Sequence, residues 1–72
     1  MRRIRHQYQH PLTKEQRTIR CTFRDNGGIQ VSLLTFEGPE FILRTRDIDE
    51  ARERWTWIAR KITGVGFQKE VK

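Results

Sequence analysis

Hydrophobic and polar residues alternate along three segments of the chain, a pattern typical of half-buried β-strands. The segments read TIRCTFR over residues 18–24, IQVSLLTF over residues 29–36 and FILRTR over residues 41–46. DNGG at residues 25–28 and EGPE at residues 37–40 separate them, and Asp, Asn, Gly and Pro are the residues that tight turns require. The pattern therefore predicts a three-stranded antiparallel meander.

The apolar members of the three strands are expected to share one face and to form the core. They are Ile19, Cys21, Phe23, Ile29, Val31, Leu33, Phe41 and Leu43. A bulge near Leu33 and Leu34 would return Phe36 to the same face. Cys21 is the single cysteine, so it has no partner for a disulfide within the chain, and we expect it to fill core space.

A period near 3.6 residues replaces the alternation after Arg46 and predicts one amphipathic helix. Asp47 is placed to accept the first free backbone N–H groups, and Glu50, three residues later, completes a capping box. Gly64 is the expected end of the helix. The stripe that would face the sheet consists of Ile48, Ala51, Trp55, Ile58 and Ile62.

The two ends of the chain differ from this central region. Residues 1–16 are basic and rich in Gln, so we expect a flexible basic arm, whose Ile4, Tyr8 and Leu12 would form a helical stripe only against a partner. Residues 65–72 form a polar tail in which Val65 and Phe67 are expected at the rim of the core. The predicted fold is α+β: a βββα domain over residues 17–64, with one C-terminal helix packed on one face of the sheet.

Charge indicates the kind of partner. The chain has 72 residues, and its 15 Lys and Arg against 9 Asp and Glu give a net charge of +6. Most of these cations are arginine, whose planar fork suits bidentate contacts with phosphates and guanine edges. We therefore expect a nucleic-acid partner. The alternative is a basic surface that serves solubility alone.

Other chemistry is weakly represented. His6 and His10 have the spacing of a shared helical metal site, but no third ligand is apparent, so we expect no metal and no cofactor. The chain lacks a Ser-His-Asp grouping and a glycine-rich phosphate loop, and we expect no enzymatic activity. It has no apolar run long enough to span a membrane, so we expect a soluble, cytoplasmic protein without a membrane partner.

The face of the sheet that the helix leaves uncovered carries the strongest functional signal. By parity it collects Thr18, Arg20, Thr22, Arg24, Gln30, Ser32, Leu34, Ile42, Arg44 and Arg46, with no carboxylate among them. A surface that served only solubility would intersperse acidic residues. The predicted nucleic-acid contacts are Arg20, Arg24, Arg44, Arg46, Thr22 and Gln30 on the sheet, and Arg2, Arg3 and Arg5 in the arm.

The order of these elements, TIRCTFR, IQVSLLTF, FILRTR and then DIDEARERWTWIARKI, resembles the three-stranded-sheet DNA-binding domains at the amino terminus of some integrases, and the plant AP2 domain. The resemblance covers residues 18–63 and rests on element order and face chemistry. It implies that the uncovered sheet face lies in the major groove of duplex DNA. The arginines at the matching positions are Arg20, Arg24, Arg44 and Arg46.

Three questions stay open: the role of Trp57, a protein partner in place of nucleic acid, and RNA in place of DNA. Trp57 lies outside the predicted stripe, so it is covered by the arm or tail, anchors a protein partner, or stacks on a base. A protein-interaction module, such as an inhibitor or assembly factor for an acidic partner, would use Trp57 and the basic surface. RNA is the other alternative, and duplex DNA is preferred over it because the uncovered face is expected to lack the exposed aromatic side chains that stack on unpaired bases.

Overall fold

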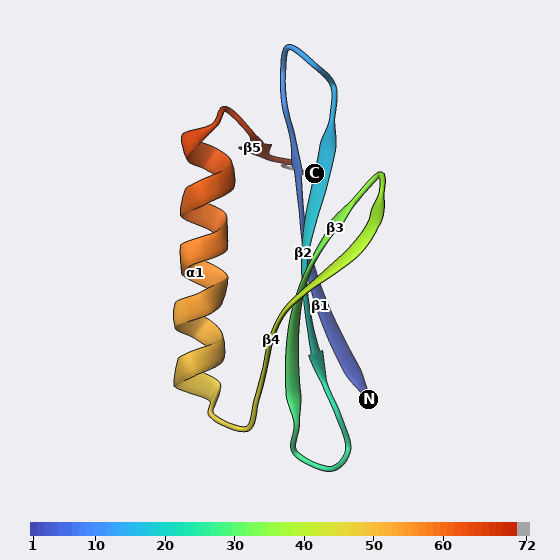
Figure 1. The fold of residues 1–72 in the computed structure, drawn as a ribbon, viewed down its shortest axis with the longest axis vertical. Coiled ribbons are helices and arrows are strands. Elements are labelled where there is room, and N and C mark those ends of the chain that lie inside the picture. Colours follow the sequence, from blue (N-terminus) through green and yellow to red (C-terminus); the bar gives the residue numbers. More distant parts are fainter. Residues whose placement is uncertain (71–72) are drawn as a thin grey trace.

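The computed structural model describes residues 1–70 as an antiparallel sheet with one helix against one of its faces (Figure 1). The elements in chain order are β1 (Arg2–Gln9), β2 (Gln16–Phe23), β3 (Ile29–Thr35), β4 (Gly38–Thr45), α1 (Ile48–Gly64) and β5 (Gln68–Lys69). The sheet has five strands in the order β4-β3-β2-β1-β5. The predicted α+β class with one packed helix is confirmed. The predicted number of strands was wrong, because both ends of the chain add to the sheet.

Strand β1 corrects the prediction of a flexible arm over residues 1–16. It pairs with β2 along its whole length, from Arg2 opposite Phe23 to Gln9 opposite Gln16. Tyr8 is only 5% exposed, and its burial holds the strand in place. A spacing of four residues returns to the same face in a strand as well as in a helix, so the spacing of Ile4 and Tyr8 did not distinguish the two.

The two hairpin turns of the meander differ in how well they were predicted. The β2–β3 turn uses DNGG as expected: Gly27 has a φ of 88°, and the Arg24 N–H donates to the Gly28 carbonyl at 2.8 Å. The β3–β4 reversal comes earlier than expected, because Thr35 already pairs with Gly38. Phe36 therefore lies at the tip of the hairpin, 83% exposed, and its predicted return to the core was wrong.

A register shift in the β3–β4 ladder changes which side chains of β4 face the helix. Val31 pairs with Leu43 and Ser32 pairs with Phe41, so β4 carries one extra residue, Ile42, between the two pairs. Such a bulge inverts the alternation on one side of it. Ile42 consequently packs against the core, whereas Phe41 lies on the opposite face. The prediction placed the bulge in β3 and assigned both residues to the wrong faces.

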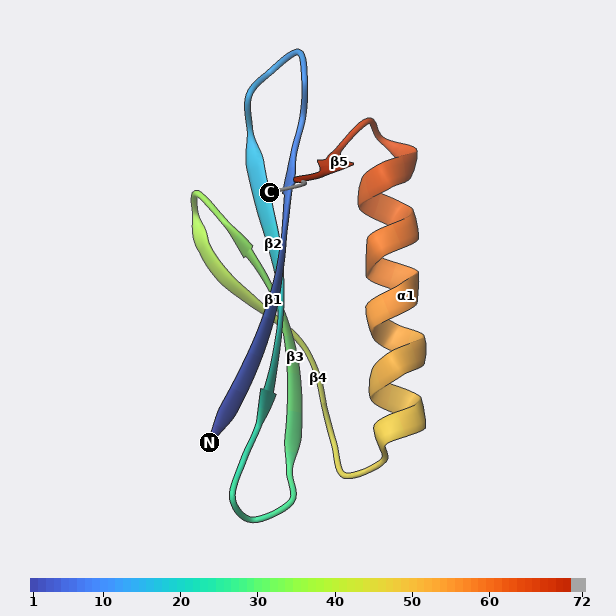
Figure 2. The same cartoon turned by 180° about the vertical axis from the view of Figure 1, so that it is seen from behind.

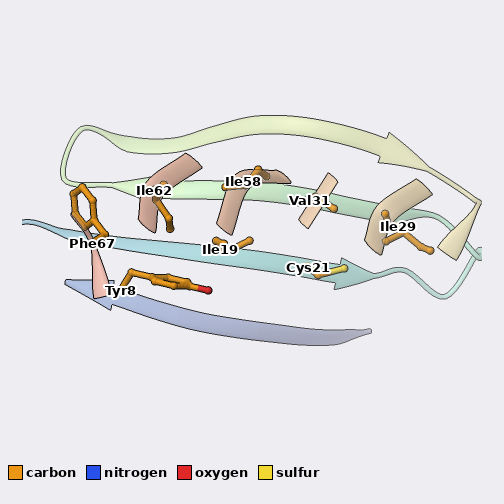
Figure 3. Close-up of a cluster of buried hydrophobic side chains, with 9 residues drawn as sticks. Tyr8, Ile19, Cys21, Ile29, Val31, Ile58, Ile62 and Phe67 are labelled. Carbon is orange, nitrogen blue, oxygen red and sulfur yellow. The ribbon is translucent and has the colours of Figure 1, made fainter. Parts of the chain in front are cut away.

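The core lies between α1 and the sheet (Figure 3). Ile19 and Val31 are fully buried at its centre. The helix contributes the predicted Ala51, Ile58 and Ile62, whereas Ile48 at its first turn is exposed. The remaining buried apolar residues are Tyr8, Cys21, Ile29 and Phe67. Burial raises the pKa of the Cys21 thiol, as expected for a cysteine that fills core space.

Both ends of α1 have the capping chemistry that fixes its length. The Asp47 carboxylate accepts the backbone N–H of Asp49 at 2.9 Å and that of Glu50 at 3.4 Å, which confirms Asp47 as the N-cap. At the other end the helix includes Gly64, and the residue with the left-handed conformation is Gly66, with a φ of 107°. That turn sends the chain back towards the sheet.

The segment after α1 closes the end of the core. Phe67 is buried as predicted, whereas Val65 is exposed. The short strand β5 then pairs with the end of β1, Lys69 lying opposite Tyr8. Residues 71 and 72, the last two of the predicted tail, lie outside the described residues. None of the helices in the described part of the chain is long and apolar enough to cross a membrane.

Candidate nucleic-acid interface

The face of the sheet opposite α1 carries no helix, as the two views show (Figures 1 and 2). Directly paired residues of an antiparallel sheet point to the same side, so the register gives its content in three rows across β1, β2, β3 and β4. The first row is Arg3, Thr22, Gln30 and Arg44. The second row is Arg5, Arg20, Ser32 and Phe41. The third row is Gln7, Thr18, Leu34 and Pro39. We call these twelve residues the uncovered face.

Charge on the uncovered face has one sign. Its four charged side chains are all arginine, and no carboxylate belongs to any of the three rows. Glu40 is the acidic residue inside β4, and it pairs with Leu33, so it points to the other side of the sheet. Asp25, in the β2–β3 turn, is paired with the N-terminal ammonium of Met1 at 2.8 Å. The positive potential of this face is therefore not cancelled by acidic neighbours within the sheet.

Arg20 holds the central position on this face. It lies directly opposite Arg5 on β1, and like charges in such a pair destabilise a sheet slightly. Arg20 Nε is buried and has no hydrogen-bond partner among the described residues. A buried donor without an acceptor costs free energy, which a bound acceptor such as a phosphate oxygen would recover.

Two further arginines, Arg24 and Arg46, lie at the end of the face near the β2–β3 turn. An Arg24 Nη atom donates to the Gln30 side-chain oxygen at 3.3 Å, which places the guanidinium beside the first row. An Arg46 Nη atom donates to the Asn26 carbonyl at 2.9 Å and so braces the turn. Together with Arg44 they line a shallow hollow of about 310 Å³.

Phe41 is the residue of this face that sequence reasoning missed. Its ring is 54% exposed, and the Arg44 guanidinium lies over it, 5.6 Å from the ring centroid. Ser32, next to Phe41 in the same row, is only 2% exposed although no helix covers it. Its neighbours in the row, Arg20 and Phe41, both have larger side chains. Phe41 could have been assigned to this face only by placing a bulge at Ile42, and no residue preference in β4 indicates a bulge there.

The structure brings together the predicted contacts on the sheet and two of the three predicted contacts of the arm. Arg20, Thr22, Gln30 and Arg44 share the uncovered face as predicted, and Arg24 and Arg46 border it. Arg3 and Arg5 join them from β1, as fixed members of a strand. Arg2 pairs with Phe23 and so lies on the helix side of the sheet, which removes it from the site.

The two histidines do not form the helical pair that a shared metal ion would need. His6 is in β1, with its ring 5.0 Å from that of Trp55, and its pKa is lowered by burial and, to a smaller extent, by Lys69. His10 follows β1, and its Nδ1 atom accepts the backbone N–H of Leu12 at 3.2 Å. Within residues 1–70 no group of three or more metal-ligating side chains is found.

Trp57 lies on the solvent side of α1 and is 48% exposed. The Lys61 ammonium is 4.6 Å from the centroid of its ring, and the Arg54 guanidinium is 5.2 Å away. Trp57 is left about half exposed, so residues 1–16 do not cover it as the arm was expected to, and the last two residues of the tail lie outside the described residues. A protein partner and a stacked base stay as the alternatives.

No family model matches this chain, and neither a curated protein nor a solved structure is significantly similar to it. The resemblance to the integrase and AP2 domains stays a prediction. The candidate interface is therefore defined by the register of the strands and by the side chains that this register brings together.

Proposed function

We propose that this protein binds nucleic acid through the uncovered face. The observation that supports the proposal is the segregation of charge: four arginines with hydroxyl and amide side chains on one side of the sheet, and no carboxylate in their three rows. Arg24 adds a fifth guanidinium at the border. That the protein has no catalytic activity and needs no cofactor stays a prediction.

The chemistry of these side chains suits a phosphate backbone. Guanidinium groups donate two parallel hydrogen bonds to phosphate oxygens, and the buried Arg20 Nε has no hydrogen-bond partner among the described residues. Thr18, Thr22 and the glutamines add shorter neutral contacts. Because the arginines are spread over rows on three strands, a polyanion would contact several of them at once, which a single small anion would not.

Salt dependence gives the expected size of the effect. Each neutralised phosphate lowers the slope of log affinity against log salt by about 0.9 for duplex DNA and about 0.7 for a single strand. The four arginines of the face together with Arg24, leaving out Arg46, whose guanidinium braces the β2–β3 turn, therefore set slopes of about −4.5 and about −3.5. A slope near zero for every nucleic acid would contradict the proposal.

A matched pair of charge reversals tests whether this face is the binding surface. The double variant Arg5→Glu and Arg44→Glu lowers the net charge from +6 by four units to +2. The control, Arg52→Glu and Arg60→Glu, makes the same change at exposed positions of α1. The first variant should retain the fold, since Glu at position 5 would face Arg20 and replace a repulsive pair by an attractive one.

Affinity for labelled 15-nucleotide single strands and 15-base-pair duplexes, followed by fluorescence anisotropy, distinguishes the two variants. Loss of two charge-assisted contacts should weaken binding by about a hundredfold in the face variant. The control should lose only what the lower net charge removes. Equal losses in the two variants would assign the binding to overall charge and reject the face.

The second candidate function is binding of an acidic protein partner through α1. Trp57 supports it, because it is exposed, carries two cations against its ring and borders a shallow hollow of about 410 Å³ that Arg52 and Arg60 also line. Exposed aromatic and arginine side chains are common at the centres of interfaces. Quenching of tryptophan fluorescence by a polyglutamate peptide, abolished in Trp57→Ala and preserved in Phe41→Val, would support this candidate over the first.

A further inference from the structure

The uncovered face is wider than the sequence predicted. Strand β1 makes it four strands across, and three spacings of about 4.8 Å place the axes of the outer strands about 14 Å apart. The major groove of B-DNA is about 12 Å wide and admits an α-helix or a two-stranded ribbon. A face of four strands with arginines at both edges cannot lie flat in that groove.

The exposed aromatic residue on this face is the second observation. Phe41 projects from the same side of the sheet as Arg20 and Arg5 and offers its ring to solvent. The faces of duplex bases are hidden in the helical stack, so an aromatic ring on a flat surface has nothing to stack on there. Unpaired bases do expose their faces, and stacking on aromatic side chains is the usual way in which proteins bind them.

Apolar and cationic groups are separated in the second and third rows of the uncovered face, whereas Arg44, in the first row, lies over the Phe41 ring. Phe41, Pro39 and Leu34 lie together on the β3–β4 side, in the second and third rows. Arg5 and Arg20 lie on the β1–β2 side of the second row. A single strand has the same two sides, because its bases are flat and largely apolar while its phosphates are charged.

A hollow continues from the third row towards the β1–β2 and β3–β4 loops, whose tips diverge in both views (Figures 1 and 2). Its volume is about 480 Å³, and Thr18, Leu34 and the exposed Phe36 are among the residues that line it. Glu15 also lines it, but its carboxylate is paired with Arg17 at 3.0 Å. The hollow would extend the binding path for a nucleic-acid strand that continues beyond Phe41.

We propose that the uncovered face binds single-stranded nucleic acid, with one base stacked on Phe41 and phosphates on Arg5, Arg20 and Arg44. The inference rests on the function proposed above and specifies its ligand. It replaces the preference for duplex DNA, since that preference depended on a face without exposed aromatic side chains.

The test compares the effect of removing one aromatic ring on the uncovered face, Phe41, with the effect of removing one on α1, Trp57. Phe41→Val removes the ring and keeps a residue that favours strands, and Phe41→Trp keeps a stacking surface. Trp57→Ala is the matched control, because Trp57 is exposed to a similar extent but lies on α1. The ligands are a 15-nucleotide oligothymidylate, the corresponding oligouridylate and a 15-base-pair duplex at one salt concentration.

The wild-type protein should bind both single strands more tightly than the duplex. Stacking of one base corresponds to between about fivefold and a hundredfold in affinity, so Phe41→Val should lose that much for single strands and little for the duplex. Phe41→Trp should restore binding, and Trp57→Ala should leave it unchanged. The two single strands show whether the 2′-hydroxyl contributes.

Tighter duplex binding together with no effect of Phe41→Val would overturn this inference and leave the proposed function standing. The same holds if Trp57→Ala weakens single-strand binding as much as Phe41→Val does. Failure to bind any of the three ligands would overturn both proposals.

Discussion

Replacement of Tyr8 by Ala tests whether the first strand is part of the folded domain. Tyr8 is 5% exposed and belongs to the same core cluster as Ile19 and Phe67 (Figure 3). Truncation of a buried aromatic side chain costs about 3–5 kcal/mol, and because Tyr8 lies near one end of the core we expect about 3 kcal/mol. A domain of this size has a total stability of about 4–11 kcal/mol, so the variant should be barely folded or strongly destabilised.

Urea unfolding monitored by circular dichroism measures this cost, and thermal unfolding should show a melting temperature lower by about 12–24 °C. Leu12→Ala is the control. Leu12 shares the four-residue spacing of Tyr8 but is 85% exposed in the β1–β2 loop, so its truncation should change stability by less than about 0.5 kcal/mol. Similar small effects in the two variants would mean that residues 1–16 are an arm after all.

Three further predictions concern stability. Asp47→Ala should cost about 1 kcal/mol in urea unfolding, because it removes the acceptor of the first free N–H groups of α1; an unchanged midpoint would reject the cap. Gly66→Ala should destabilise the fold, because Gly66 has a φ of 107° and a Cβ there would lie 2.6 Å from Nε2 of His10. The control Gly64→Ala should stabilise the fold by about 0.5 kcal/mol, because nothing lies within 4 Å of a Cβ at that position. The lowered pKa of His6 means that the unfolded chain takes up the proton first, so stability should fall as the pH drops below about 6.5 and level off below the folded-state pKa. His6→Gln should flatten that step, and an unchanged pH profile would assign it to another group.

Local patterns in the sequence were sufficient to predict the central elements. Strict alternation identified β2 and β3, DNGG identified the turn between them, and Asp47 identified the start of α1. In each case the residues that determine the element lie within it or next to it. Arg20 and Arg44 were therefore correctly assigned to the face opposite the helix, because the alternation that positions them is set locally.

The errors arose where tertiary contacts decide the structure. β1 contains few apolar residues, and its strand conformation depends on pairing with β2 and on the burial of Tyr8 by Phe67 and its neighbours. The bulge at Ile42 depends on the register between β3 and β4, which residue preferences in either strand do not specify. Both errors affected the candidate site, since they hid a fourth strand of the uncovered face and the exposed ring of Phe41.

A nuclear magnetic resonance titration of the protein with a 15-nucleotide single strand tests the central claim most directly, because it reports on each side chain of the uncovered face separately. The largest shifts are expected at the Arg20 Nε–H group, at the backbone amide of Ser32 and at the ring protons of Phe41. Shifts confined to α1 around Trp57, or no shift at any residue, would contradict the claim that this face binds nucleic acid.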